Sequence, residues 1–226
     1  MTNKVNKMTN KVNKMTNKVN KMPVSYDYVL MIDFEANCLK DAQIVPQEII
    51  EFPVILIKIY GENNRPKELG RFHSYVKPRI HKLTEFCKKL TGITQDKVDS
   101  AKDIVEVIND FNSWLQSFGL NPWDTLVPGK KFIFMSCGNW DLMTCFPNCM
   151  NYFNIEYPRC FKFWLNIKKE FTKFYKKPKP FDLHALLREF DLKPHGQHHS
   201  GMDDTINIAR VLILMITDGY RPKIYL

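Results

Sequence analysis

Three apolar runs of this chain belong in a protein core. They are residues 28–33 (YVLMID), 48–60 (EIIEFPVILIKIY) and 131–137 (KFIFMSC). Each run is short and rich in β-branched and aromatic residues, which favours a buried strand. A strand without an exposed face needs cover on both sides, so the chain is expected to build a sheet between two layers of helices.

The order of the remaining elements refines this expectation. A third early strand is predicted at 71–76, after the turn at 61–66, and the connections suit an antiparallel meander with a bulge at Pro53. Helical spacing of apolar residues then appears in five places: 83–90, 104–115, 163–174, 183–190 and 203–217. Ser100 is the predicted cap of the second of these helices, and Asp182 is the predicted cap of the fourth. The sequence therefore predicts an α/β fold with a mixed central sheet, three antiparallel strands followed by parallel ones, and helices on both sides.

The first 21 residues differ in kind from the rest. They repeat MTNKVNK three times and carry six lysines and no acid, so of the net charge of +9 the rest of the chain holds 9 − 6 = +3. The heptad spacing permits a coiled coil, but Asn and Thr are poor helix formers and every charge is positive. We therefore expect a disordered or loosely helical basic tail at 1–22 and one globular domain at 23–226, which is a monomer unless the tail associates.

The cysteines and the hydropathy indicate the compartment. None of the six cysteines forms a C-x-x-C pair, and no run is apolar enough to span a membrane or act as a signal peptide. We expect reduced thiols and an intracellular protein, cytoplasmic or nuclear, without a membrane partner.

Four acids and one histidine follow the predicted core elements. Asp33 and Glu35 lie two residues apart after the first strand, so their side chains share a face, and Asp141 begins a helix after the strand at 131–137. Asp203 and Asp204 open the last helix, where one of them is expected to face the site, and His199 precedes them. Carboxylates this close repel one another unless a divalent cation offsets the repulsion, and a neutral histidine can accept a proton.

Each of these residues also has a structural reading. The acids of D-x-E can lie in solvent at a strand end, Asp141 can serve as a helix N-terminal acid, and His199 can be an exposed loop residue. A zinc site built from His195, His198 and His199 with Cys145 or Cys149 is a rival, but adjacent histidines diverge and no C-x-x-C pair supports it.

Five segments in order resemble the DEDDh family of 3′→5′ exonucleases, in the branch of the three-prime histone mRNA exonuclease and the enhanced-RNAi exonucleases. They are MIDFEANC, EIIEFPVILI, FCKKLTGITQ, CGNWD and HSGMDDTINIAR, and the likeness covers roughly residues 26–220. The resemblance implies a ribonuclease H-like fold and 3′→5′ exonuclease activity on single-stranded RNA 3′ ends, releasing nucleoside 5′-monophosphates.

The resemblance also assigns roles to individual residues. Asp33, Glu35, Asp141 and Asp204 would hold two Mg²⁺ or Mn²⁺ ions, and His199 would be the general base. Substrate contacts would come from Phe34, Asn37, Leu90, Thr91, Gly92, Ile93 and Trp140. The family often has Thr where this chain has Asn37, and nothing here resembles the separate stem-loop-binding domain of its long members. A DNA-degrading nuclease of the same fold and an inactive RNA-binding protein remain alternatives.

Overall fold

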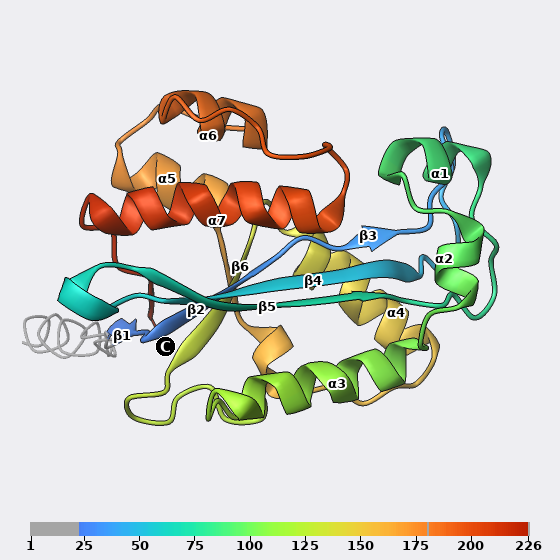
Figure 1. The fold of residues 1–226 in the computed structure, drawn as a ribbon, viewed down its shortest axis with the longest axis horizontal. Helices are drawn as coiled ribbons and strands as arrows, with labels where there is room; N and C mark the ends of the chain where they lie inside the picture. Colours follow the sequence, from blue (N-terminus) through green and yellow to red (C-terminus); the bar gives the residue numbers. More distant parts are fainter. Residues whose placement is uncertain (1–22, 180, 226) are drawn as a thin grey trace, which may run out of the picture.

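A twisted mixed sheet forms the centre of the molecule (Figure 1). The computed structural model describes residues 23–179 and 181–225, so the predicted tail at 1–22 lies outside the described residues. The sheet consists of β2 (Tyr28–Ile32), β3 (Glu35–Ala36), β4 (Ile49–Lys58), β5 (Lys67–Tyr75), β6 (Phe132–Ser136) and β7 (Trp164–Asn166). Strand β4 runs antiparallel to β2, β3 and β5, whereas β2, β6 and β7 are parallel, which confirms the predicted mixed sheet.

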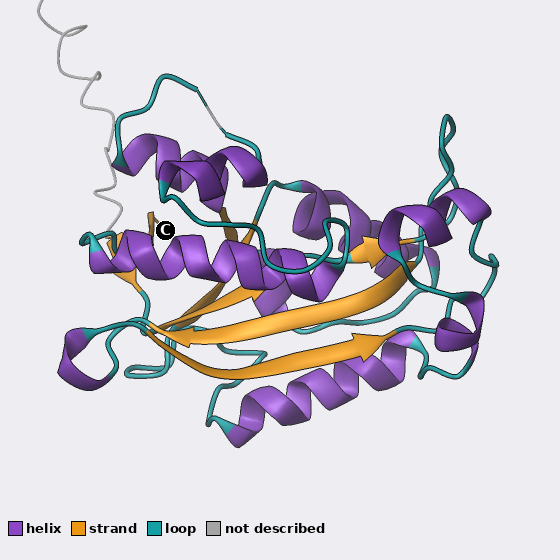
Figure 2. Ribbon diagram, turned by 45° about the horizontal axis from the view of Figure 1, so that its top comes forward, coloured by secondary structure: helices purple, strands orange, loops and turns teal. Residues whose placement is uncertain are grey.

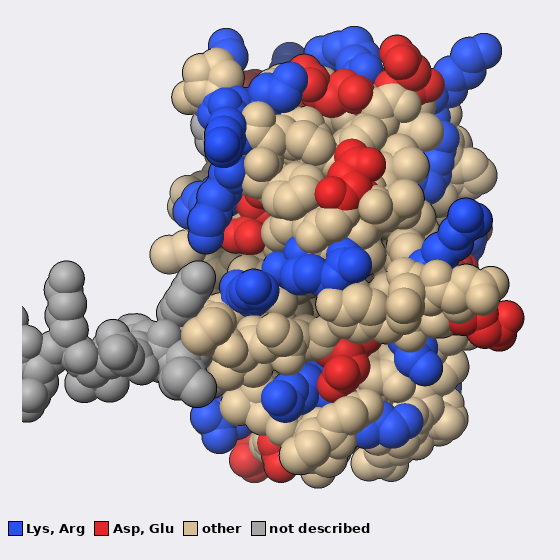
Figure 3. Space-filling model, turned by 90° about the vertical axis from the view of Figure 1, so that its left-hand side faces the viewer, with Lys and Arg blue, Asp and Glu red and all other residues tan. Residues whose placement is uncertain are grey.

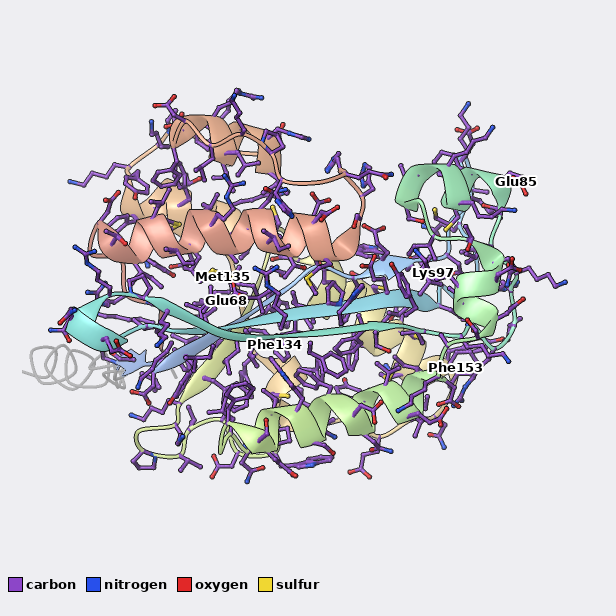
Figure 4. All side chains as sticks on the ribbon, viewed as in Figure 1. Glu68, Glu85, Lys97, Phe134, Met135 and Phe153 are labelled. Atoms are coloured by element: carbon purple, nitrogen blue, oxygen red, sulfur yellow. The ribbon has the colours of Figure 1, made fainter. Side chains whose placement is uncertain are left out.

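Helices cover both faces of this sheet (Figure 2). The helices are α1 (Glu85–Thr91), α2 (Gln95–Asp99), α3 (Ile104–Ser117), α4 (Phe146–Tyr152), α5 (Ile167–Phe174), α6 (Leu183–Glu189) and α7 (Gly201–Thr217). Helices α3 and α4 contribute to one hydrophobic core, and α5, α6 and α7 contribute to the other. Consecutive residues of β6 show the division, because Phe134 belongs to the first core and Met135 to the second (Figure 4).

The structure corrects several predicted boundaries. The first residues of the predicted helix 163–174 instead form β7, which adds a parallel strand beside β6. Pro53 pairs in register with His73, so it is not at a bulge; the extra residues are Ile50 of β4, opposite β3, and Leu69 of β5, opposite Leu56 and Ile57. Helix α3 is capped by Asp103, whose carboxylate accepts hydrogen bonds from Val105 and Glu106, and not by Ser100, which ends α2.

Three short elements have no counterpart in the sequence prediction. Helix α2 has only five residues. A separate two-stranded sheet pairs β1 (Pro23–Ser25) with β8 (Lys223–Tyr225) and so joins the two ends of the described chain. Elements of three to five residues carry too little periodicity to be recognised from sequence.

Three further features concern the surface charge, the hydropathy of the helices and the cysteines. On the end of the molecule shown in Figure 3, basic and acidic side chains are interspersed. Within residues 23–179 and 181–225, no helix has the length and hydropathy needed to cross a lipid bilayer. All six cysteines are free thiols.

Candidate active site

The first two acids flank a break in the sheet. Strand β2 ends at Ile32 and pairing resumes at Glu35 in β3, and both strands pair with β4 on the same side. Asp33 and Glu35 are partly exposed, whereas Phe34 between them is 3% exposed and packs on Phe52 and Phe146. The alternation predicted from the sequence therefore holds, with the carboxylates on one side and the phenyl ring in the core.

Asp141 reaches the same place from the segment that follows β6, the strand beside β2 in the sheet. It begins a π-helical turn (Asp141–Cys145) that continues into α4, and it is 5% exposed. The backbone N–H of Phe34 donates to Asp141 Oδ1 at 2.9 Å. Since Phe34 lies between the first two acids, this hydrogen bond connects the π-helical turn to the β2–β3 break and fixes the orientation of the third carboxylate.

The N-terminus of α7 supplies the fourth acid. Asp204 is 3% exposed, and its Oδ2 accepts the backbone N–H of His199 at 2.9 Å and lies 3.1 Å from His198 Nδ1. Asp203 instead accepts the backbone N–H of Gln197, so Asp204 is the member of the pair that faces the cavity. Gly196 is required here, because its φ is +62° and a Cβ would lie 2.1 Å from the Asp203 carboxyl carbon.

Glu51 supports this helix from beneath and was not among the predicted site residues. It is 2% exposed on β4, opposite Glu35, and its two carboxylate oxygens accept the N–H groups of Gly201 and Met202 at 2.9 and 3.1 Å. The Ser200 side chain makes no capping hydrogen bond, so Glu51 takes that role and also contacts His73 Nε2 at 2.8 Å. The one sequence signal for this role was that Glu51 is an acid inside the apolar run 48–60.

The four acids line one open cavity of about 450 Å³ together with His199, His198, Trp140 and Lys168. Ligand oxygens of Asp33, Glu35 and Asp204 lie within 4.8 Å of one another. Burial, followed by repulsion from Asp141, Asp204 and Glu35, raises the pKa of Asp33 well above its ordinary range. Burial, followed by repulsion from Glu51, Asp204 and Asp141, raises the pKa of Glu35 to about 9, and burial raises that of Asp141 to about 6.

These properties fit a divalent cation. The donors are all carboxylate oxygens, which Mg²⁺ and Mn²⁺ prefer. A cluster of acids with raised pKa values is electrostatically unfavourable when ionised, and a bound cation removes that penalty. The residues present can therefore hold divalent metal.

His199 lies beside the cluster in a left-handed backbone conformation, with φ of +65°. Burial and the neighbouring His198 lower the pKa of His199, although Asp204 opposes this. The imidazole is therefore neutral at physiological pH, as a proton acceptor must be. His199 also lines the cavity that holds the four acids.

Lys168 is a second residue that the sequence prediction missed. It lies in the first turn of α5, lines the cavity, and lowers the pKa values of Asp33 and Asp141. A lysine in a lysine-rich helix gives no sequence signal of this role. It is placed to offset part of the acidic charge and to attract phosphate.

The predicted substrate contacts divide into two groups. Trp140 is 40% exposed and lines the cavity, as does Phe34 through its position between the acids. Asn37 requires a correction, because it is fully buried and its Oδ1 accepts the Glu48 N–H at 2.7 Å, so it ties the base of a loop rather than facing substrate. At the end of α1, Thr91 and Ile93 are buried while Leu90 is half-buried and Gly92 exposed, and these four residues do not line the cavity.

The rival zinc site is not assembled. Among the described residues, two groups of three side chains could hold a metal. One is Asp33, Glu35 and Asp204, the other is His198, His199 and Asp204, and neither contains a cysteine. Cys145 and Cys149 are buried in the core on the α3 side of the sheet.

Comparisons with known proteins agree with this geometry. The family model described as Exonuclease matches residues 30–212. ERI1 exoribonuclease 3 of Mus musculus is 37% identical over 200 residues, which are 88% of this chain and 56% of that protein, so the chain spans about half the length of the curated relatives it matches. The nuclease domain of 3′hExo, described as a DEDDh family member bound to rAMP, superposes with a TM-score of 0.76 at 33% identity, covering 87% of this chain and 96% of that one. Cell-death related nuclease 4 superposes with a TM-score of 0.75 at 31% identity, covering 86% and 65%.

The fold is thus that of the ribonuclease H-like nucleases. This chain belongs to the DEDDh exonuclease family, in the branch that contains the 3′hExo and ERI1 exoribonucleases.

Proposed function

We propose that this protein is a metal-dependent 3′→5′ exoribonuclease that removes nucleotides from single-stranded 3′ ends and releases nucleoside 5′-monophosphates. The observation that carries the proposal is the convergence of Asp33, Glu35, Asp141, Asp204 and His199 on one open cavity. The names of the relatives support it, since they include 3′-5′ exoribonuclease 1 of Homo sapiens, which is 34% identical. One related structure is described as recognising the 3′ end of a histone mRNA stem-loop.

The proposed metal ligands are the four carboxylates, for two Mg²⁺ or Mn²⁺ ions. Bound there, the cations would stabilise charge on the scissile phosphate and acidify the attacking water. The chain's own part is positional: the Phe34 N–H holds Asp141 and the His199 N–H holds Asp204, so both carboxylates are oriented before substrate binds.

His199 is the proposed general base. Its imidazole lines the same cavity as the acids, and its lowered pKa leaves the ring nitrogen free to accept the proton of the attacking water. Lys168 follows β7 at the same end of the parallel strands as Asp33 and Asp141, where it is placed to contact the phosphate. The exposed indole of Trp140 offers a face on which a terminal base can stack.

The test is hydrolysis of a 5′-labelled single-stranded RNA with and without Mg²⁺, beside Asp33→Asn. We expect a metal-dependent ladder that shortens from the 3′ end and is abolished by Asp33→Asn. Asp191→Asn is the matched control, because Asp191 is exposed and its φ of +52° suits asparagine. A wild-type rate for Asp33→Asn would refute the proposed site.

The same assay with a DNA oligonucleotide of matching sequence tests the alternative of a DNA-degrading nuclease. Faster hydrolysis of DNA would select it, and binding without hydrolysis of either polymer would indicate an inactive nucleic-acid-binding protein.

A further inference from the structure

A second cavity, of about 780 Å³, adjoins the candidate active site. One wall is the loop 38–47, and the other is the outer face of the π-helical turn and α4; we call the space between them the amide trough. Trp140 lines both this trough and the cavity that holds the acids, so the two spaces meet at the indole. The trough therefore leads directly away from the proposed cleavage site.

The helical wall presents a stripe of uncharged polar side chains. Trp140, Thr144, Asn148 and Asn151 follow one another at intervals of three to four residues, and all four are exposed. Residues at this spacing share one side of a helix. Gln43, which is exposed, and Gln47 face them from the loop.

The chemistry of this lining suits nucleobases rather than phosphates. The residues that line the trough include four carboxamides and no Lys, Arg, Asp or Glu. A carboxamide offers both a donor and an acceptor, as base edges do, whereas phosphates are bound mainly by Lys and Arg. The exposed Tyr152 adds an aromatic face on which an upstream base can stack, while Trp140 stands at the boundary with the terminal position.

The size of the trough agrees with this use. Sites for small molecules occupy roughly 300–1,000 Å³, and the trough lies within that range. Under the proposed function the terminal nucleotide lies at the four acids, so the trough, which begins at Trp140, can hold bases further upstream.

We propose that the amide trough is a binding subsite for the unpaired bases that precede the 3′-terminal nucleotide of the substrate. This proposal rests on the proposed function, because it needs a strand that enters the active site by its 3′ end. The trough would make affinity depend on substrate length, because a mononucleotide fills only the terminal position whereas an oligonucleotide also fills the trough.

Equilibrium binding distinguishes the trough from the catalytic centre. The probe is a fluorescein-labelled single-stranded 10-mer RNA with hydrolysis-resistant terminal linkages, measured in Mg²⁺ by anisotropy, and AMP serves as a competitor for the terminal position. For the double variant Asn148→Ala, Asn151→Ala we expect a roughly fivefold to tenfold higher Kd for the 10-mer, as the loss of one or two hydrogen bonds implies. The inhibition constant of AMP should not change.

Two further variants make the result decisive. Gln43→Ala, on the loop wall, should also weaken binding of the 10-mer, and Asn109→Ala, an exposed position on α3, should not. Alanine is favourable in a helix, so the helical variants are expected to fold. An unchanged Kd in both trough variants would overturn the subsite, even if the protein hydrolyses RNA. Weakened binding of the 10-mer by a protein that hydrolyses nothing would support the subsite while refuting the proposed function.

Discussion

His199 contributes to the site through both its backbone and its side chain. Its N–H holds the Asp204 carboxylate, and its left-handed conformation brings the imidazole to the edge of the cavity. Few residues other than glycine tolerate this conformation, and asparagine is among them. One short loop therefore couples the proposed base to a proposed metal ligand, which lies five residues later in the sequence.

A His199→Asn variant isolates the side chain. Asparagine keeps the N–H and suits the left-handed backbone, so Asp204 should stay in place while the rate of hydrolysis falls by about 10²–10⁴. His199 accepts a proton only when it is neutral, and its pKa is lowered from the ordinary value of about 6.5. The wild-type rate should therefore rise with pH below about 6.5, and the titration of His199 should change it no further above that pH. The variant should lose that acidic limb.

The pH–rate profile of both proteins provides the measurement, with His195→Asn as control, since the His195 side chain is 53% exposed and does not line the cavity. If the acidic limb persisted in His199→Asn, another group would have to be the base.

At the scale of elements, the site depends on the ends of strands and helices. Two acids flank the break between β2 and β3, one begins the π-helical turn after β6, and one lies in the first turn of α7. The N-terminus of α7 is held by Glu51 of β4, whose carboxylate accepts two of its free N–H groups. A strand residue therefore sets the position of a helix residue in the site.

Glu51→Gln should loosen that connection. The amide can still accept one hydrogen bond but brings no negative charge to the helix N-terminus, so we expect a loss of about 1–3 kcal/mol in the free energy of unfolding. Because Asp204 moves with α7, Mg²⁺ affinity should fall as well. Denaturant unfolding and Mg²⁺ titration would measure both effects. Glu62→Gln, whose side chain is 85% exposed, should change neither. An unaltered Mg²⁺ affinity in a destabilised Glu51→Gln protein would limit Glu51 to a structural role.

At the scale of the whole molecule, the acidic cluster opposes folding whenever it is ionised without a cation. The pKa of Glu35 is raised to about 9 in the folded protein and lies near 4.5 in an unfolded chain. The folded state therefore binds more protons than the unfolded state between these values, so stability falls as pH rises through this window. Asp141, with a pKa of about 6, adds to the effect at its lower end.

We accordingly expect the melting temperature of the protein in EDTA to decrease from pH 5 to pH 9. A change of 1 kcal/mol corresponds to roughly 2–4 °C for a chain of this size. Saturating Mg²⁺ should stabilise the protein more at pH 8 than at pH 5.5, and Glu35→Gln should flatten the curve in EDTA. Scanning calorimetry at four pH values tests this. Parallel curves with and without Mg²⁺ would mean that the cluster does not bind the cation.

The sequence by itself determined the main elements of the fold and the residues of the candidate site. Apolar runs longer than five residues report burial directly, so β2, β4 and β6 were predicted close to their observed positions, as was α7. Asp33, Glu35, Asp141, Asp204 and His199 were recognised because they lie in distinctive local patterns. Their predicted roles as ligands and base remain predictions.

Only the tertiary structure decided which side chains meet. Glu51 and Lys168 are more than 100 residues apart in the sequence and have no motif of their own, yet one holds α7 and the other lines the cavity. Asn37 matched a substrate-contact position in sequence but is buried at the base of the loop 38–47. Local patterns fix secondary structure because they depend on neighbouring residues, whereas burial, pKa values and the union of two cavities at Trp140 depend on packing between distant segments.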